Sequence, residues 1–292
     1  MFFISFILFK LRFLEQEFIL NPLKYILIFV IFFNIYLLYV FDVSTFDQIL
    51  NLIISFGIFT FHSNTNYKNH KNLNIIQISS SFLILLMLLY RSFWLHHGDN
   101  FIYLLLPVLY LTLVMLYFPF ENLFKNYKPL LISLLLPITK VIFIPLSIIF
   151  SPLSAFFTWL LLNAIGFESV LKGQEILYKN SGINVTFSCS GSGQILFCLS
   201  AMIILNYCFP LRSIRLLILQ LFIASFLTFS SNIIRLFLLT LYVNTANSDG
   251  FSIFDYLHGG SGGLIFGFLS MAFSCESFKR IYYIQAMPND IN

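Results

Sequence analysis

The sequence places a cysteine, an arginine and a histidine, in that order, near the predicted ends of apolar segments. Cys189 lies in SCSGSGQ, Arg235 in SSNIIRLFLL and His258 in FDYLHGGSGG. A thiolate can attack a carbonyl carbon, a histidine can accept and return a proton near neutral pH, and a guanidinium can stabilise a developing oxyanion. Brought together by the fold, these three side chains could carry out acyl transfer.

Cys189 differs from the other cysteines in its surroundings. We expect it in the first turn of a helix, where the helix dipole favours a thiolate. Its small neighbours leave room for a substrate backbone: Ser190, Gly191, Ser192 and Gly193. Cys198, Cys208 and Cys275 lie within apolar segments and are expected to behave as small hydrophobic side chains. The sequence has no CxxC motif and no histidine cluster at metal-ligand spacing, so we expect neither a metal nor a cofactor.

Arg235 is expected to face other helices, because a guanidinium exposed to lipid would cost several kcal/mol. Polar residues precede it at helical spacing and form one stripe: Ser225, Thr228, Ser231 and Asn232. Asn232 lies one turn before Arg235 and could position it by a hydrogen bond. The alternative is a purely structural role, with the stripe as an interhelical hydrogen-bond seam and the arginine reaching the membrane interface.

His258 is the candidate general acid and base. Asp255, three residues earlier, could orient its ring or cap the helix that follows. Gly259, Gly263 and Gly267 repeat every four residues, a spacing that lets another helix approach closely. We therefore expect the glycines to form a packing surface rather than a phosphate-binding loop.

We assign no catalytic role to two other features of the sequence. Lys140, between Pro137 and Pro145, is a charge within an apolar segment and needs a partner, for which Glu168 or a lipid head group is a candidate. The pair HH at 96–97 lacks companion metal ligands and stays unassigned.

The elements that carry these residues are predicted to be membrane helices. The chain has 292 residues, of which 59% are apolar and 10% charged, and its mean hydropathy is +0.90. A water-soluble domain of this size could not bury so much apolar surface. The long runs of Ile, Leu and Phe lack the alternation of an outer-membrane barrel, so we expect an all-α integral membrane protein.

About eight spans are predicted from runs near the length of about 20 residues that crosses a bilayer. They cover residues 23–41, 46–62, 75–95, 101–120, 130–150, 189–208, 213–243 and 258–278. The net charge of +4 reports topology rather than nucleic-acid binding, because the basic residues lie in short loops. Eleven of the sixteen basic residues fall on one side of an alternating topology: Lys10, Arg12, Lys24, Lys68, Lys71, Lys125, Lys128, Arg212, Arg215, Lys279 and Arg280. By the positive-inside rule both termini are cytoplasmic, and Cys189, Arg235 and His258 meet at the outer face.

We expect one membrane domain over residues 1–292, with scaffold helices in 1–150 and catalytic helices in 189–278. The stretch 151–188 between them begins with the apolar SPLSAFFTWLLLNAIGF, which is expected to be re-entrant or interfacial. It continues with the polar ESVLKGQEILYKNSGINVTF, where Gly and Asn predict a short β-like, non-helical excursion at the outer face.

The motifs SCSGSG, SNIIR and FDYLHGG, in that order, resemble the exosortase and archaeosortase family of multi-spanning membrane transpeptidases. The forms FDYxHGGxG and GxxxxxxGQEI, at 166–176, look most like the cyanobacterial branch, the cyanoexosortases. This resemblance implies a catalytic set of Cys189, Arg235 and His258, in a protein of the inner membrane. It also implies that exported proteins with C-terminal sorting signals of the PEP-CTERM kind are cleaved through a thioester. They would then pass to an acceptor linked to extracellular polysaccharide.

Two other functions fit parts of the sequence. A serine intramembrane protease could use Ser192 with His258, although Cys189 and Arg235 would then have no role. A non-catalytic transporter or assembly factor for envelope polysaccharide could use the Arg and Lys charges to line a path, although the chain lacks the internal repeats common in transporters.

Overall fold

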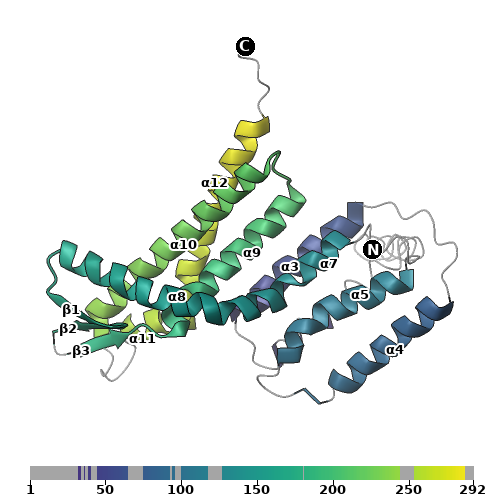
Figure 1. Cartoon of the computed structure of the whole chain (residues 1–292), viewed down its shortest axis with the longest axis horizontal. Coiled ribbons are helices and arrows are strands. Elements are labelled where there is room, and N and C mark those ends of the chain that lie inside the picture. The colour runs from purple at the N-terminus through teal and green to yellow at the C-terminus, as the bar shows by residue number, and fades with distance from the viewer. Residues whose placement is uncertain are drawn as a thin grey trace, which may run out of the picture. The chain divides into compact units, whose positions relative to one another are not determined.

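The structure is a computed structural model of the chain, shown in Figure 1. It describes residues 45–64, 75–92, 94–95, 100–117, 127–179, 181–243 and 253–286, together with the helical residues 32–33, 36 and 39–40. The first predicted span, the pair HH at 96–97 and six of the eleven basic residues used for the topology lie largely or wholly outside the described residues. The chain divides into two compact units, the first formed by residues 1–44 and 51–137 and the second by residues 45–50 and 138–292.

The first unit is a set of apolar helices. It contains most of α3 (Thr45–Asn64), α4 (Ile75–Ser92), the 3-10 turn η1 (Asn100–Leu104), α5 (Leu105–Tyr117) and α7 (Tyr127–Ser133). A small hydrophobic cluster holds α4 to η1 and α5 through Leu88, Leu95, Ile102, Leu105 and Leu109. The side chain of Gln77 on α4 donates a hydrogen bond of 2.8 Å to the carbonyl of Met115 on α5.

The second unit carries all three candidate catalytic residues. Its helices are α8 (Leu135–Ala164), α9 (Ser192–Cys208), α10 (Ile214–Tyr242), α11 (Ile253–His258) and α12 (Gly260–Ala286). Helices α9, α10 and α12 pack against one another, and α10 lies along α12 (Figure 1). Gln194 on α9 donates a 2.9 Å hydrogen bond to the carbonyl of Gly263 on α12.

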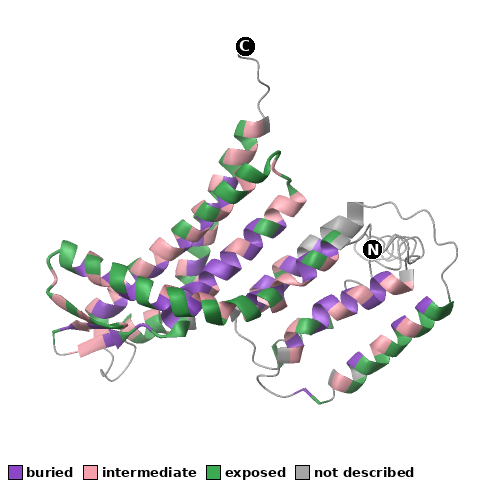
Figure 2. Ribbon diagram, in the orientation of Figure 1, coloured by how far each residue is buried: buried purple, intermediate pink, exposed green. Residues whose placement is uncertain are grey.

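Helix α10 is apolar outside and polar inside, as expected for a helix surrounded by lipid. Ile218, Phe222 and Phe226 lie four residues apart and are each at least 60% exposed. The opposite face buries Gln220, Ala224, Thr228, Asn232 and Arg235. Figure 2 shows the same division of buried and exposed faces along the helices of this unit.

Among the described helices, α8 and α10 are long and apolar enough to cross a membrane. They have 30 and 29 residues. Shorter apolar helices cover 75–88, 101–116 and 192–208. The chain is therefore helical and has membrane-span candidates, as predicted.

The expected re-entrant segment after residue 150 is instead the second half of α8. The predicted span ends at residue 150, but the helix continues through both Pro145 and Pro152 to Ala164. Its buried face explains why, since Ser151, Ser154, Ala155, Thr158 and Leu162 recur at helical spacing and are all fully buried.

The predicted β-like excursion is a three-stranded antiparallel sheet. Its strands are β1 (Ser169–Lys172), β2 (Glu175–Tyr178) and β3 (Ser181–Asn184), in that order across the sheet. Gly173, with φ of 65°, begins the two-residue turn between β1 and β2, where a positive φ suits the twist of a hairpin. In the sequence the sheet lies between α8 and the turn that contains Cys189, so the sheet helps to determine where Cys189 lies in the second unit.

Candidate active site

Two serines of α8 hold the chain that leads to Cys189. Ser151 donates a hydrogen bond to the carbonyl of Val185, and Ser154 donates one of 2.8 Å to the carbonyl of Ser190. Trp159 donates a hydrogen bond of 3.1 Å from its indole to the carbonyl of Ser169 at the start of β1. These contacts fix the backbone on both sides of the cysteine to one helix.

The sequence predicts that Cys189 lies in the first turn of a helix, but in the structure it precedes the helix. It ends the 3-10 turn η3 (Phe187–Cys189), and α9 begins three residues later at Ser192. Gly191 separates the two elements with a φ of 82°, which glycine adopts far more easily than other residues. A Cβ at Gly191 would also lie 2.7 Å from the amide nitrogen of Asn232, so this position requires glycine.

Asn232 positions the cysteine rather than the arginine. Its Nδ2 atom donates a 3.1 Å hydrogen bond to the carbonyl of Cys189, and the expected hydrogen bond to Arg235 is not formed. The amide side chain of Asn232 is fully buried, and its Oδ1 atom has no hydrogen-bond partner among the described residues. Helix α10 therefore fixes the backbone of Cys189 directly.

His258 ends a short helix instead of opening a long one. It is the last residue of α11, and α12 starts at Gly260. A Cβ at Gly262 would lie 2.4 Å from the carbonyl oxygen of Leu257, so glycine there allows α11 to fold back tightly on α12. The motif FDYLHGGSGG therefore contains a bend between two helices, where the sequence predicts the start of one helix.

The imidazole of His258 is positioned by an aromatic ring. Phe254, one helical turn earlier, stacks on it with ring centroids 5.4 Å apart and planes 9° apart. Asp255 lies in the first turn of α11 with an exposed side chain. The stacking leaves the ring of His258 exposed at the surface of the unit.

Cys189 and His258 line the same pocket, although they are 69 positions apart in the chain. The pocket has a volume of about 150 Å³. A cavity of about this size holds a benzene-sized group. Its other lining residues come from β3, α10 and α11, and are Gly182, Ile183, Asn184, Leu236, Leu239 and Phe254. We call it the Cys189 pocket.

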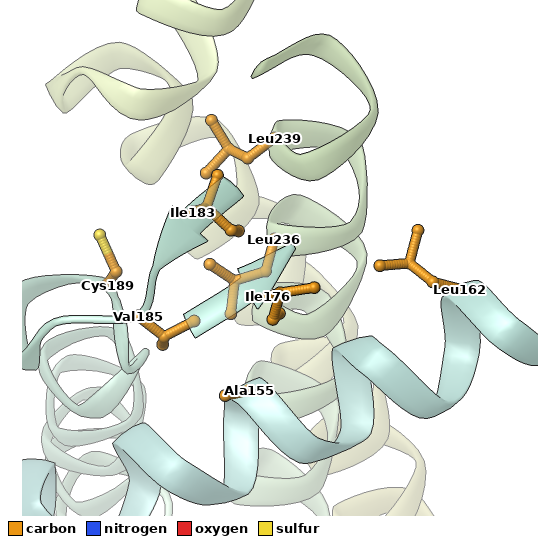
Figure 3. Close-up of a cluster of buried hydrophobic side chains, with 8 residues drawn as sticks. All are labelled: Ala155, Leu162, Ile176, Ile183, Val185, Cys189, Leu236 and Leu239. Atoms are coloured by element: carbon orange, nitrogen blue, oxygen red, sulfur yellow. The ribbon is translucent and has the colours of Figure 1, made fainter. Parts of the chain in front are cut away.

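Figure 3 shows the hydrophobic cluster that supports this pocket. The buried thiol of Cys189 lies at the edge of a group that includes Ile183 of β3 and Leu236 and Leu239 of α10. These apolar side chains form a wall that holds the nucleophile candidate in a defined position.

Arg235 precedes Leu236, which lines the pocket, but is not itself one of the lining residues. Its side chain is buried. Its Nε atom has no hydrogen-bond partner among the described residues, and no carboxylate among them forms a salt bridge with it. A buried guanidinium without an anionic partner is costly, so this one is suited to receive an anion.

Lys140 has a partner that local sequence could not indicate. It forms a salt bridge with Asp47, a residue 93 positions earlier, and not with Glu168. Both residues belong to the second unit. This ion pair supports the structural role expected for Lys140.

The serines near Cys189 are structural. The hydroxyl groups of Ser190 and Ser192 lie 2.8 Å apart and hydrogen bond to each other, and Ser190 also donates to the carbonyl of Phe187. Both are fully buried, and neither lines the Cys189 pocket. Ser192 is therefore not presented to His258.

Sequence reasoning missed the contributions of β3, Phe254 and Ser154. Phe254 could have been found from its spacing of four residues to His258 on one helical face. Ser154 and the strand residues Gly182 to Asn184 could not, because their proximity to Cys189 depends on packing between distant elements.

A comparison with protein families finds that a family model described as Transmembrane exosortase matches residues 44–275. That range includes every residue that lines the Cys189 pocket. No curated protein and no solved structure matches the chain.

Proposed function

The chain belongs to the transmembrane exosortase family, and from this premise we propose that it is a cysteine transpeptidase that cleaves C-terminal sorting signals of exported proteins. Family membership supports a membrane transpeptidase or sorting role in general. The observation that carries the finer proposal is the Cys189 pocket, which Cys189 and His258 line together with Leu236, the residue that follows Arg235.

The first half of the reaction forms a thioester. His258 takes the proton of the Cys189 thiol, and the sulfur attacks the carbonyl carbon of the scissile peptide bond. The tetrahedral intermediate collapses as the carbon–nitrogen bond breaks, and His258 returns the proton to the departing amine. The exported protein is then joined through its new C-terminal carbonyl to the sulfur of Cys189.

Arg235 stabilises the oxyanion in this scheme, because the backbone amides of Cys189 and Ser190 are already engaged. The amide of Cys189 donates to the carbonyl of Thr186 at 3.0 Å, and that of Ser190 to the carbonyl of Phe187 at 3.4 Å. A cysteine protease often uses backbone N–H groups for this purpose. Here the guanidinium of Arg235, whose Nε atom has no hydrogen-bond partner among the described residues, supplies the positive charge instead.

The second half transfers the protein to an acceptor. A nucleophile attacks the thioester, His258 accepts its proton, and the sulfur leaves as a thiol or thiolate. The acceptor we propose is linked to extracellular polysaccharide, and the signals are of the PEP-CTERM kind. The features of GQEI and FDYLHGG favour the cyanobacterial branch of the family.

The proposal includes a plasma-membrane location with the Cys189 pocket at the outer face. It also includes about eight spans and cytoplasmic termini, because the distribution of Lys and Arg in the sequence favours this topology. Exported proteins would reach the pocket after translocation, with their C-terminal signals still in the membrane.

The serine protease alternative has little support from the geometry, because Ser192 is buried and bonded to Ser190. A thiol-alkylating reagent is expected to abolish activity, and a serine-directed fluorophosphonate to leave it unchanged. The opposite pattern would favour Ser192 as the nucleophile.

The test of the proposed function uses the full chain in liposomes with a panel of sorting-signal peptides from exported proteins of the same genome. Hydroxylamine serves as an artificial acceptor. We expect a hydroxamate at the new C-terminus of at least one peptide and no product with Cys189→Ala. A hydrolysed product alone would indicate a protease without transfer, and no product across the panel would favour a non-catalytic role.

A further inference from the structure

The strand β3 presents one edge of its backbone to the Cys189 pocket. Within the described residues β3 pairs only with β2, so it is the last strand of the sheet on that side. An edge strand carries N–H and C=O groups that no neighbouring strand satisfies, and these groups can pair with another extended chain.

The register shows which groups of β3 point to that edge. Val185 donates a 3.0 Å hydrogen bond to Gln174, its partner in the continued register of β2 and β3. In an antiparallel pair the bonded residues alternate, so Ser181 and Ile183 also face β2. The N–H and C=O groups of Gly182 and the N–H of Asn184 therefore point away from β2.

The same residues line the Cys189 pocket. Gly182, Ile183 and Asn184 form one side of the pocket, and Cys189 and His258 lie on it as well. The carbonyl of Asn184 already accepts a 3.0 Å hydrogen bond from Thr186. Gly182 is thus the residue that can exchange two backbone hydrogen bonds with a chain lying in the pocket, and it has no side chain to obstruct that chain.

We infer that the substrate binds as an added strand on β3, with one of its residues paired to Gly182 and its scissile carbonyl next to Cys189. This inference rests on the proposed function and specifies how that site recognises its substrate. Strand addition recognises backbone rather than side chains, so the segment beside Cys189 must be extended and must offer N–H groups at every second residue.

The inference predicts a period of two in the response to backbone methylation. Full-length Cys189→Ala protein in liposomes is titrated with a fluorescent signal peptide that the wild-type protein processes, and with copies N-methylated at one amide each. We expect methylation of the amide paired with Gly182, and of amides two residues away, to weaken binding about tenfold or more. Each of these methyl groups would be placed against β3, and the first change also removes the hydrogen bond to the carbonyl of Gly182. The intervening amides should change binding less than about twofold.

A pair of protein variants tests the same edge of β3 by changing the protein instead of the peptide. Asn184→Pro removes an N–H that points away from β2, a substitution that an edge strand tolerates. It is expected to weaken binding of the unmodified peptide, whereas Val170→Ala, at an exposed residue of β1 that does not line the Cys189 pocket, should bind normally. If Asn184→Pro fails to accumulate, the methylation series alone decides.

The outcomes separate this inference from the proposed function. If wild-type protein forms no product with any unmodified peptide, the proposed function fails and strand addition fails with it. If product forms but methylation shows no alternation, strand addition alone is wrong. Alternating sensitivity, together with product formation, supports both.

Discussion

The two ends of the assembly of α9, α10 and α12 differ in whether the buried polar groups of α10 have hydrogen-bond partners. Gln220 and Arg235 lie fifteen residues apart on the buried face of α10, about 22 Å along the helix axis. Around Gln220 both amide atoms are satisfied. On the Arg235 side two buried polar atoms, Nε of Arg235 and Oδ1 of Asn232, have no partner among the described residues.

The Gln220 end is a complete hydrogen-bond network. Gln220 donates to the carbonyl of Ser274 at 2.8 Å and accepts from the hydroxyl of Ser277 at 3.0 Å. The thiol of Cys198 donates to the hydroxyl of Ser274 at 3.4 Å. Polar contacts of this kind hold membrane helices together, so this end is structural.

The Arg235 end has the opposite character. Atoms without partners there include Nε of Arg235 and Oδ1 of Asn232, and the backbone bond from Asn232 holds Cys189 in place. Buried polar groups are nearly always satisfied in native proteins, and exceptions are concentrated at functional sites. The comparison teaches that the chain leaves polar groups unsatisfied at the end where an anionic intermediate is proposed to form.

The largest expected difference between the two ends is between their cysteines. Cys189→Ala should lower processing of a signal peptide by about a thousandfold or more, because the nucleophile is lost. Cys198→Ala removes a thiol of similar burial from the structural end and should retain nearly full activity. Rates measured with purified protein in liposomes check both. Equal loss in the two variants would break the assignment of chemistry to one end.

His258→Gln should lower the rate by about a hundredfold to ten-thousandfold, the range found for general acid–base catalysts. The amide cannot shuttle a proton, although it keeps a polar side chain at the pocket. The control is His258→Gln assayed for peptide binding, which should be retained. Processing at the wild-type rate would remove His258 from the mechanism.

Arg235→Lys should reduce processing by about a hundredfold to a thousandfold, the usual effect of losing an oxyanion donor. An ammonium keeps the charge but lacks the planar fork of the guanidinium. Arg212→Lys, at an exposed residue, is the matched control and should have no effect. Normal kinetics for Arg235→Lys would indicate that a positive charge is enough and that the geometry of the donors is unimportant.

Gln220→Ala should have the smallest effect, and on stability rather than chemistry. It removes the hydrogen bonds of Gln220 to the carbonyl of Ser274 and from the hydroxyl of Ser277, which keep their bond to each other, at a cost of about 1 kcal/mol. Thermal unfolding in detergent should show a lower midpoint, while the rate per folded molecule stays unchanged. A catalytic defect without loss of stability would contradict the structural role of this end.

The three candidate residues could be selected from the sequence, because each lies in a short motif with its own local pattern. The polar stripe of α10 was also predictable, since it depends only on helical spacing. The excursion before Cys189 was expected from its Gly and Asn residues and is a three-stranded sheet.

The parts that could not be predicted depend on contacts between distant residues. The continuation of α8 past Pro152 follows from burial of Ser154 and its neighbours against the Cys189 turn, which the local sequence does not show. The partner of Lys140, Asp47, is on another helix. The start of α9 at Ser192 rather than Cys189 follows from the positive φ of Gly191, where any side chain would collide with Asn232.

The most direct test of the central claim is intact-protein mass spectrometry after incubation of the full chain in liposomes with a processed signal peptide. The account predicts an adduct of the acyl fragment that hydroxylamine removes, that maps to Cys189, and that persists in Cys198→Ala. An adduct on Ser192 or Cys198, or processing of the peptide by Cys189→Ala protein, would contradict the claim that the thiol at the Arg235 end forms the covalent intermediate.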